Sequence, residues 1–504
     1  MTATGPRSGA RVSSEAVTSV FPPIPLERFA TVVPDAELRP VDAGVVIEDV
    51  AYDSRSVGPG SLFFCVPGEQ VDGHDFAAQA HAAGAVAMVV ERWLDLDASQ
   101  LRVRSVREAM GPMSALAFGE PASAMSTVGI TGTNGKTTVT YLLESIFRAA
   151  GWKPGVIGTM GARLGGDPFP LARTTPEAPD LHRLLALMRD RDVRAVAVEA
   201  SSHALAQHRT DGVLFDVAVF TNLSQDHLDY HVSMEGYLEA KARLFTPTHA
   251  RHGVINVDDP AGRRLSTAEI PVTTYALDRD ADLRVSDVAA TPDGLSLRLA
   301  GLPIRSPLRG GFNAVNIAAA AAAARRLGAE DGPIVEGIAT LDTVPGRMEP
   351  VDAGQGFLVV VDYAHTPDSI RSVLRAARPL TPGRLILVFG CGGDRDRLKR
   401  PSMGAAAVEA ADLTIITTDN PRSEDPLAII AEIEDGAANG PGDHVVEPDR
   451  RTAIRTAIRS ARPGDVVVIA GKGHESLQEF VDGSVPFDDR VVAREELVAL
   501  GADA

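Results

Sequence analysis

The sequence predicts an α/β protein of three domains, and three observations support this. From residue 127 onward, apolar stretches end one after another in loops of Gly, Ser, Thr, Asp or His. Such stretches are typical of buried parallel strands, whose ligands gather at the C-terminal edge of the sheet. The same pattern begins again after a break at Val344–Pro350 ("VPGRMEP"). The length of 504 residues allows three domains of roughly 100–200 residues each.

The first part of the chain divides into a tail and a small domain. Residues 1–24 lack the apolar core of a signal peptide, and we expect a disordered tail there. Residues 25–124 hold strand-like runs around an alanine-rich helical stretch at Phe76–Ala83, which predicts a small α/β module. The strand-like runs are Val45–Ile47, Ser61–Val66 and Val86–Val90.

The central domain, residues 125–345, opens with a strand, a glycine-rich loop and a helix. The strand is Val128–Ile130, and the loop reads "TGTNGKTT". The helix is predicted over Thr137–Ala149, with Gly151 as its cap. Exposed amides at the start of such a helix attract phosphate. This order predicts a parallel sheet of the P-loop NTPase-like type.

The residues of the loop suit the chemistry of a bound nucleotide. Gly132 and Gly135 let the backbone approach phosphate closely. Lys136 reaches the terminal phosphates, and Thr137 can place its hydroxyl on Mg²⁺. Ile130 stands where the pattern G-x-x-x-x-G-K-[ST] has its first glycine. The alternative is a glycine-rich turn whose lysine is incidental.

Two further side chains are predicted beside this loop. Glu199 ends the strand "AVAVE", and His227 follows the strand "DVAVFTN". Magnesium needs partners at the neighbouring strand ends, and both residues are within reach of the phosphates. Taken alone, the sequence favours a structural histidine for His227 over a metal ligand. Glu199 is harder to explain structurally, because an unpaired carboxylate at the end of a buried strand is costly.

The C-terminal domain, residues 346–504, repeats the pattern and predicts a Rossmann-like α/β fold. Three of its strand ends lead into "GGDRDRLKRP", "TTDNPRSEDP" and "AGKGHE". Arg395 and Arg422 bring bidentate donors, Asn420 a neutral amide and Glu475 a counter-charge. Such a mixed pocket suits a ligand with both carboxylates and ammonium groups.

The composition excludes several classes of function. Lys+Arg 49 against Asp+Glu 67 gives a net charge of −18, which opposes binding to a nucleic-acid backbone over a large surface. Two cysteines, Cys65 and Cys391, provide no disulfide framework or cysteine-rich metal site and fit a reducing cytoplasm. The longest apolar stretch, Ala314–Ala324, is shorter than the roughly 20 residues of a membrane span and predicts a packed helix. We therefore expect neither nucleic-acid nor membrane binding.

Seven motifs, in order along about residues 51–490, resemble the Mur ligase family of ATP-dependent amide-bond-forming enzymes. They are "TGTNGKTT", "EASSHAL", "HLDYH", "YLEAKARLF", "GGFNAVNIAAA", "PGRMEP" and "VDYAHTPDS".

The resemblance implies that ATP phosphorylates a substrate carboxylate to an acyl phosphate, and that an amine then displaces the phosphate. The motif "DNPR" implies that meso-2,6-diaminopimelate is added to UDP-N-acetylmuramoyl-L-alanyl-D-glutamate in peptidoglycan precursor synthesis. A cytoplasmic monomer is expected.

The resemblance assigns roles to matching positions of the nucleotide site. The implied catalytic residues are Lys136, Glu199, His227 and Lys241. The implied ATP contacts are Gly132, Thr133, Asn134, Gly135, Lys136, Thr137, Thr138, Asn316, Arg347, Asp362 and His365. Because Arg347 and Asp362 lie beyond the break, we expect the ATP site to be complete only when the domains close.

Lys241 is the least obvious of these residues. It lies in a predicted amphipathic helix, where the sequence alone favours a solvated lysine. The resemblance implies a lysine carbamylated by CO₂, which converts the cation into a carboxylate ligand for a second Mg²⁺. The implied metal ligands are then Thr137, Glu199, His227 and the Lys241 carbamate.

The resemblance also implies two substrate sites. The UDP-sugar peptide lies across the first two domains, which makes residues 25–124 a UDP-binding domain beside the ATP-binding domain. Its implied contacts are Tyr52, Ser54, Glu69, Gln70, Val71, Thr174, Thr175, Ser201, Gln207 and Arg209. The C-terminal domain binds the amino acid, and the implied diaminopimelate contacts are Arg395, Asp419, Asn420, Pro421, Arg422, Gly471 and Glu475. Ordinary turn chemistry is the alternative for Glu69–Val71.

Three other functions fit parts of the sequence. A lysine-adding relative is disfavoured by Arg422, because a lysine substrate offers no second carboxylate. Folylpolyglutamate synthetase has a similar P-loop domain but lacks a separate UDP-binding domain. A nucleotide-dependent switch would hydrolyse ATP without an acyl acceptor. Product analysis with and without an amino acid separates these.

Overall fold

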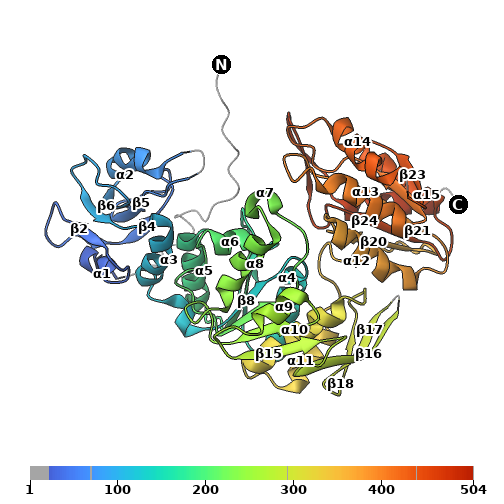
Figure 1. Ribbon diagram of the computed structural model, residues 1–504, viewed down its shortest axis with the longest axis horizontal. Coiled ribbons are helices and arrows are strands. Elements are labelled where there is room, and N and C mark those ends of the chain that lie inside the picture. The colour runs from blue at the N-terminus through green and yellow to red at the C-terminus, as the bar shows by residue number, and fades with distance from the viewer. Residues whose placement is uncertain (1–21, 69–70, 292, 439, 503–504) are drawn as a thin grey trace.

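The computed structural model describes residues 22–68, 71–291, 293–438 and 440–502 and shows three units, each built around its own sheet (Figure 1). Most of the expected tail, residues 1–24, and the predicted contacts Glu69 and Gln70 lie outside these ranges. The central unit lies between the other two in the picture. The predicted three-domain α/β architecture is confirmed.

The N-terminal unit is a five-stranded sheet in the order β2-β7-β6-β5-β4. Strands β4 to β7 are parallel, and β2 pairs antiparallel with β7. A separate pair joins β1 to β3. The elements are β1 (Ile24–Pro25), α1 (Leu26–Ala30), β2 (Glu37–Arg39), β3 (Val46–Ile47), β4 (Asp49–Ala51), β5 (Ser61–Phe64), η2 (Gly73–Phe76), α2 (Ala77–Ala82), β6 (Ala85–Val90), β7 (Ser99–Arg102) and α3 (Val106–Ala117).

The central unit has an 11-stranded sheet in the order β11-β10-β9-β12-β8-β13-β14-β15-β16-β17-β18. The stretch from β9 to β16 is parallel, and both ends of the sheet are antiparallel. Its strands are β8 (Ser126–Thr131), β9 (Pro154–Gly158), β10 (Gly161–Leu164), β11 (Asp167–Phe169), β12 (Ala195–Glu199), β13 (Val217–Phe220), β14 (Gly253–Asn256), β15 (Val272–Ala276), β16 (Leu283–Thr291), β17 (Gly294–Leu299) and β18 (Leu302–Ser306). Its helices are η3 (Pro121–Ala124), α4 (Lys136–Ala149), α5 (Ala178–Asp190), α6 (Ser202–Ala206), α7 (Leu228–His231), α8 (Met234–Ala242), η4 (Arg243–Phe245), α9 (Pro260–Leu265), α10 (Asn313–Arg326) and α11 (Asp331–Ala339).

Both faces of the central strands are buried, as parallel strands between helices require. Along β8 and β12, Val128, Ala195 and Ala197 face the core that includes α4, α10 and α11. The alternate residues Val196 and Val198 face the core that includes α5. The alanines of α10 are almost fully buried, so the predicted packed helix at Ala314–Ala324 is confirmed. No helix in the described part of the chain has the length and apolarity to span a bilayer.

The C-terminal unit is a six-stranded sheet in the order β19-β20-β24-β21-β22-β23, parallel except at β19. Its strands are β19 (Glu349–Pro350), β20 (Leu358–Asp362), β21 (Leu385–Phe389), β22 (Leu413–Ile416), β23 (Asp443–Val446), β24 (Val466–Ala470) and the hairpin β25 (Leu477–Phe480) and β26 (Gly483–Pro486). Its helices are α12 (Pro367–Ala377), η5 (Arg378–Leu380), α13 (Lys399–Ala410), α14 (Pro426–Ala437), α15 (Arg450–Ser460) and α16 (Asp489–Ala502). The polar loops after β20, β21, β22 and β24 therefore leave the same edge of one sheet.

Candidate active site

The loop between β8 and α4 has the backbone geometry of a phosphate-binding loop. Gly132 and Gly135 have φ values of +147° and +89°. A Cβ atom on Gly132 would lie 1.9 Å from Thr221 Oγ1, and one on Gly135 would lie 2.4 Å from Asn316 Oδ1. Only glycine avoids both the strained dihedral angle and the collision. The predicted strand, loop and helix are all present.

Side chains that follow β13 hold this loop in place. The backbone nitrogen of Asn134 donates to Asn222 Oδ1 at 2.9 Å, and Thr221 Oγ1 donates to the Asn134 carbonyl at 2.6 Å. The Thr133 and Tyr237 hydroxyls lie 3.2 Å apart. Because these contacts fix the loop from outside, its remaining amides are free to face a ligand.

Lys136, Thr137 and Glu199 meet at the start of α4. The Lys136 ammonium donates to the carbonyls of Gly132 and Thr133, each at 2.9 Å. Thr137 Oγ1 donates to Glu199 Oε2 at 3.1 Å. Burial lowers the pKa of Lys136, and the nearby Glu199 carboxylate opposes that shift. The structure thus brings an ammonium, a hydroxyl and a carboxylate together, as predicted.

A hollow of about 280 Å³ lies against this loop and extends to the C-terminal unit. Seven of the predicted ATP contacts line it: Asn134, Gly135, Thr137, Thr138, Asn316, Arg347 and Asp362. Arg347 Nη2 approaches Thr137 Oγ1 to 3.4 Å across the two units. Asp362 accepts from the backbone nitrogens of Met348 and Ala364, each at 2.8 Å, and burial raises its pKa.

His365 lies close to the central unit without lining the hollow. Its Nε2 is 4.0 Å from Asp226 Oδ2, and its Nδ1 lies 2.7 Å from the carbonyl of Tyr363. Asp226 is itself buried, and its Oδ2 also lies 3.4 Å from Nε2 of His227. Sequence reasoning missed Asp226, although it directly precedes His227 in "SQDHLDYH".

Lys241 is 1% exposed, so the alternative of a solvated lysine is wrong. Its ammonium lies 4.3 Å from the centre of the Tyr237 ring. Burial lowers the pKa of Lys241 well below its ordinary value, and the positive charge of Lys136 lowers it further. Both effects shift Lys241 toward the neutral amine.

His227 belongs to a group of aromatic side chains around Lys241. Its ring centre lies 4.7 Å from that of His203 and 6.2 Å from that of Tyr237. Burial lowers the pKa of His227 to about 4, so the imidazole is neutral near pH 7. In the described ranges, no group of three or more His, Cys, Asp or Glu side chains is arranged to hold a metal ion.

Five of the ten predicted UDP-sugar peptide contacts gather around the C-terminal end of β12: Thr174, Thr175, Ser201, Gln207 and Arg209. Thr175 Oγ1 donates to the Glu199 carbonyl at 2.7 Å and lies 3.2 Å from Ser201 Oγ. Thr174 Oγ1 is 3.2 Å from Thr159 Oγ1, and Thr159 Oγ1 donates to Glu199 Oε2 at 3.0 Å. This group lies directly beside the phosphate loop, because Glu199 contacts both.

Arg209 adds a buried positive charge to this group. Its guanidinium donates to the Gln207 carboxamide at 2.5 Å and to the Thr175 carbonyl at 3.2 Å. Its Nε lies 3.1 Å from Glu177, which also pairs with Arg107 of the N-terminal unit at 2.6 Å. Sequence reasoning missed this ion-pair network between the two units.

The predicted contacts in the N-terminal unit lie apart from this group or at its rim. Tyr52 donates to Asp180 of α5 at 2.7 Å, and burial raises its pKa. Ser54 Oγ donates to Gln79 at 3.4 Å, and Val71 is 62% exposed.

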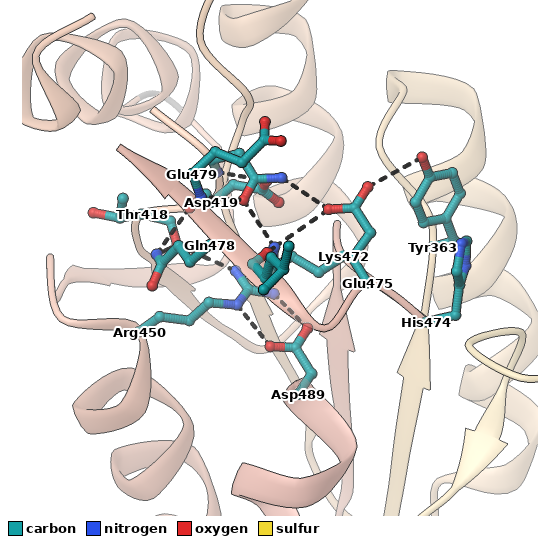
Figure 2. Close-up of polar contacts among 12 residues, drawn as sticks. Tyr363, Thr418, Asp419, Arg450, Lys472, His474, Glu475, Gln478, Glu479 and Asp489 are labelled. Carbon is teal, nitrogen blue, oxygen red and sulfur yellow. Dashed lines mark hydrogen bonds and ion pairs between the residues drawn. The ribbon is translucent and has the colours of Figure 1, made fainter. Parts of the chain in front are cut away.

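The loops after β22 and β24 bring together polar side chains of the predicted amino-acid pocket in the C-terminal unit, and Figure 2 shows their contacts. Asn420 Nδ2 donates to Glu475 Oε2 at 2.8 Å, and the Tyr363 hydroxyl donates to Glu475 Oε1 at 3.3 Å. Asp419 accepts from the backbone nitrogen of Asn420 at 2.7 Å. A Cβ atom on Gly471 would lie 2.5 Å from Asp419 Oδ2, so glycine is required there as well. Pro421 is buried in the same loop.

The two predicted arginines lie nearer the protein surface than Asn420 and Asp419. Arg422 donates to Glu479 at 2.8 Å and to the Gly393 carbonyl at 2.7 Å. Arg395 is exposed and donates to the Asp394 carbonyl at 3.0 Å. Arg422 has a φ of +54°, a conformation that costs a residue other than glycine free energy.

A buried ion pair supports the pocket from below (Figure 2). Arg450 donates to Asp489 at 2.7 and 2.8 Å, and both side chains are fully buried. Arg450 also donates to the carbonyls of Ala470 and Thr418, at the ends of β24 and β22. The pair therefore holds together the two loops that carry the predicted diaminopimelate contacts.

We expect Asp489→Ala to lower the free energy of unfolding of the C-terminal unit by about 3–5 kcal/mol, because an unpaired guanidinium remains buried. Urea denaturation followed by circular dichroism measures this. The double variant Arg450→Met/Asp489→Leu should recover part of the loss, since it removes both charges. A single variant as stable as the parent chain would contradict the prediction.

Three sequence profiles of one family match the chain in order. They are described as Mur ligase family, catalytic domain (residues 46–114), Mur ligase middle domain (residues 130–324) and Mur ligase, glutamate ligase domain (residues 346–473). The chain is 46% identical over 454 residues to the UDP-N-acetylmuramoyl-L-alanyl-D-glutamate–2,6-diaminopimelate ligase of Geobacillus thermodenitrificans, with 88% of this chain and 93% of that protein covered. It is 45% identical over 499 residues to the ligase of the same name from Streptomyces coelicolor, with 94% and 98% covered.

Solved structures show the same architecture. A UDP-N-acetylmuramoyl-L-alanyl-D-glutamate–2,6-diaminopimelate ligase matches with a TM-score of 0.68 at 34% identity, covering 95% of this chain and 99% of that one. The MurF ligase of Thermotoga maritima in complex with ADP matches with a TM-score of 0.61 at 19% identity, covering 90% and 98%. Folylpolyglutamate synthase of Mycobacterium tuberculosis matches with a TM-score of 0.59 at 21% identity, covering 71% and 91%. The last two show a shared fold.

Proposed function

The chain belongs to the Mur ligase family, and from this premise we propose that it joins meso-2,6-diaminopimelate to UDP-N-acetylmuramoyl-L-alanyl-D-glutamate. The enzyme is an ATP-dependent ligase of peptidoglycan precursor synthesis that releases ADP and phosphate. The relatives at 45% and 46% identity carry this activity in their names. We further propose that it acts as a monomer in the cytoplasm and binds neither nucleic acid nor membrane.

One observation supports a ligase over an ATP-driven switch: a single residue, Tyr363, joins the nucleotide hollow to the polar side chains of the predicted amino-acid pocket. Tyr363 lines the hollow, and its hydroxyl donates to Glu475 in the pocket at 3.3 Å. Arg347 lies over the same ring at 4.7 Å and reaches Thr137 in the phosphate loop. An activated carboxylate beside the loop would therefore lie near an amine held in the pocket.

The residues at the phosphate loop fit a magnesium ion. Mg²⁺ prefers oxygen ligands, and it is usually held by one or two protein groups together with substrate phosphates. Thr137 Oγ1 and the Glu199 carboxylate lie 3.1 Å apart beside Lys136, and Thr159 adds a hydroxyl on Glu199. When bound, the ion would neutralise phosphate charge. We assign Thr137 and Glu199 to hold it.

Lys241 and His227 fit a second magnesium ion only if Lys241 is carbamylated, because an ammonium cannot ligate a cation. In that reaction the neutral amine attacks CO₂, forms an N–C bond and releases one proton. Burial shifts Lys241 toward the neutral amine, which is the nucleophile in this reaction. The imidazole of His227 is neutral as well, and this is the form that ligates a metal ion.

The catalytic step follows from the charges around the loop. The carboxylate of the UDP-linked dipeptide attacks the terminal phosphorus of ATP, and the bond to ADP breaks as the acyl phosphate forms. Lys136 and Arg347 would stabilise the charge that develops on the transferred group. The neutral amine then attacks the carbonyl carbon of the acyl phosphate, loses a proton and expels phosphate as the amide forms. The protein contributes chiefly by holding both substrates in one geometry.

For the UDP-sugar peptide, we assign Thr174, Thr175, Ser201, Gln207 and Arg209 to the part nearest the reaction. These side chains lie beside Glu199, so the dipeptide end of the substrate would reach the phosphate loop. The remaining assigned contacts lie on the N-terminal unit or outside the described residues: Tyr52, Ser54, Glu69, Gln70 and Val71.

The function predicts an ADP release that requires the UDP-muramoyl dipeptide, diaminopimelate and Mg²⁺ together. Coupled spectrophotometry measures ADP, and mass spectrometry identifies the tripeptide product. Omission of either the dipeptide or diaminopimelate should reduce the rate of ADP release to background. Comparable ATP turnover with neither the dipeptide nor the amino acid would instead support a switch, and glutamate addition to a folate would support a folylpolyglutamate synthase.

A further inference from the structure

Lys472 is a buried ammonium at the centre of the amino-acid pocket (Figure 2). It lies two residues after the end of β24, and its side chain has no exposed surface. Its Nζ donates to Asn420 Oδ1 at 2.9 Å and to the Leu477 carbonyl at 2.6 Å, and it lies 3.3 Å from Glu475 Oε2. Burial of a charged group costs free energy unless hydrogen-bonding partners offset that cost. The contacts of Lys472 with Asn420, Leu477 and Glu475 provide such partners.

The ammonium decides which end of the Asn420 carboxamide faces Glu475. An ammonium only donates hydrogen bonds, so the atom that faces it must be the carboxamide oxygen. The backbone nitrogen of Glu479 donates to the same oxygen at 3.1 Å. Asn420 Nδ2 is thereby directed to Glu475 Oε2 at 2.8 Å.

The same contacts decide how Glu475 meets a ligand. Its Oε2 is occupied by Asn420 and Lys472, whereas its Oε1 accepts only the long 3.3 Å bond from Tyr363 among the contacts found in the described residues. The Glu475 side chain is 31% exposed, so this carboxylate is accessible from the pocket. Oε1 is thus the oxygen presented to a substrate ammonium.

We propose that Lys472 is a positioning residue for the amino-acid substrate, which fixes the Asn420 carboxamide and the Glu475 carboxylate in their binding orientation. It also offsets the negative charge that Asp419 and Glu475 place in the pocket, which would otherwise repel the carboxylates of the substrate. The inference rests on the proposed function, since it assumes that the amino acid binds here.

Steady-state kinetics of Lys472→Met and Lys472→Gln test the proposal. The methionine variant keeps most of the length of the side chain without donors, and the glutamine variant keeps a neutral donor. We expect Lys472→Met to raise the KM for diaminopimelate at least about tenfold, with a smaller rise for Lys472→Gln. The KM values for ATP and for the dipeptide should stay within about twofold of those of the parent chain.

A positioning role and a structural role predict different changes in the KM values. Positioning raises the KM for diaminopimelate alone. A merely structural role would lower kcat through loss of active enzyme, or would raise all three KM values together, and either result overturns the proposal. A folded variant whose KM for diaminopimelate is unchanged also overturns it. If thermal unfolding shows that Lys472→Met is not folded, Lys472→Gln decides by the same criteria.

Failure of the proposed function would be seen separately. If the parent chain forms no product with diaminopimelate, that function is wrong. The two variants are then compared with the amino acid that the parent chain does use, or by the binding of candidate amino acids in isothermal titration calorimetry. An unchanged KM or affinity in that comparison overturns the role of Lys472.

Discussion

Replacement of Lys241 by alanine should lower kcat by about 10²–10³-fold or more, because the carbamate that we propose as a magnesium ligand is lost. The residue is 1% exposed, and its pKa is lowered well below the ordinary value by burial. Both properties favour the neutral amine that reacts with CO₂. Initial rates of ADP release at saturating substrates measure the effect.

The carbamate itself can be observed directly. The chain contains five lysines: Lys136, Lys153, Lys241, Lys399 and Lys472. With ¹³C-labelled bicarbonate, one carbamate resonance should appear in the NMR spectrum and disappear in Lys241→Ala. Lys153→Ala is the matched control, since Lys153 is an exposed lysine of the same unit, and it should keep both the resonance and the activity.

Two results would refute the role of Lys241. One is near-normal turnover by the alanine variant. The other is a crystal structure with bound metal and nucleotide in which Lys241 carries a bare ammonium. Removal of CO₂ from the buffer provides an independent readout, because the rate of the parent chain should fall and recover when bicarbonate is added.

The second large effect concerns the choice between meso-diaminopimelate and L-lysine, which differ in the distal carboxylate. We expect discrimination on the order of 10⁴ in kcat/KM, because lysine leaves guanidinium donors without a partner. Arg422 uses Nε for Glu479 and Nη1 for the Gly393 carbonyl. A guanidinium has five N–H donors, so donors remain for a substrate carboxylate.

Arg422→Ala should raise the KM for diaminopimelate and narrow its advantage over lysine. Competition assays with both amino acids, followed by mass spectrometry of the products, measure the ratio. Arg451→Ala is the control, because Arg451 pairs with Glu495 on the surface of α15 and α16 and lies outside the pocket. If the Arg422 variant retains the parent KM and preference, the arginine is structural, and the bond to Glu479 is its role.

The local parts of the nucleotide site could be predicted from the sequence. Strand, loop and helix from Ser126 to Ala149 are neighbours in the chain, and the phosphate loop depends on glycines at fixed positions. The alternation of apolar strands with polar loops likewise predicted where ligands gather, because parallel strands end at one edge of the sheet. Resemblance to a family then supplied residues that lie far from the loop in sequence, such as Arg347.

Other features could not be predicted from the pattern alone. The apolar spacing around Lys241 favoured a solvated helix face, but the packing of α8 inside the central unit buries it, with its ammonium over the ring of Tyr237 from the same helix. Asp226 and Lys472 lie in loops whose composition resembles any polar turn, so sequence reasoning missed them. The network of Glu177 with Arg107 and Arg209 joins residues 32 to 70 positions apart, between two units.

By itself, the sequence therefore determined the fold class, the phosphate loop and, through the family resemblance, the chemistry proposed for the ligands. Only the tertiary structure decided which charged side chains lose water and which partners they gain. The physical reason is that backbone hydrogen bonding and apolar periodicity act over a few neighbouring residues, whereas desolvation depends on segments that meet from distant parts of the chain. Lys241 and Lys472 are the clearest cases, because both lysines are buried in the folded chain and the roles that we propose for them depend on that burial.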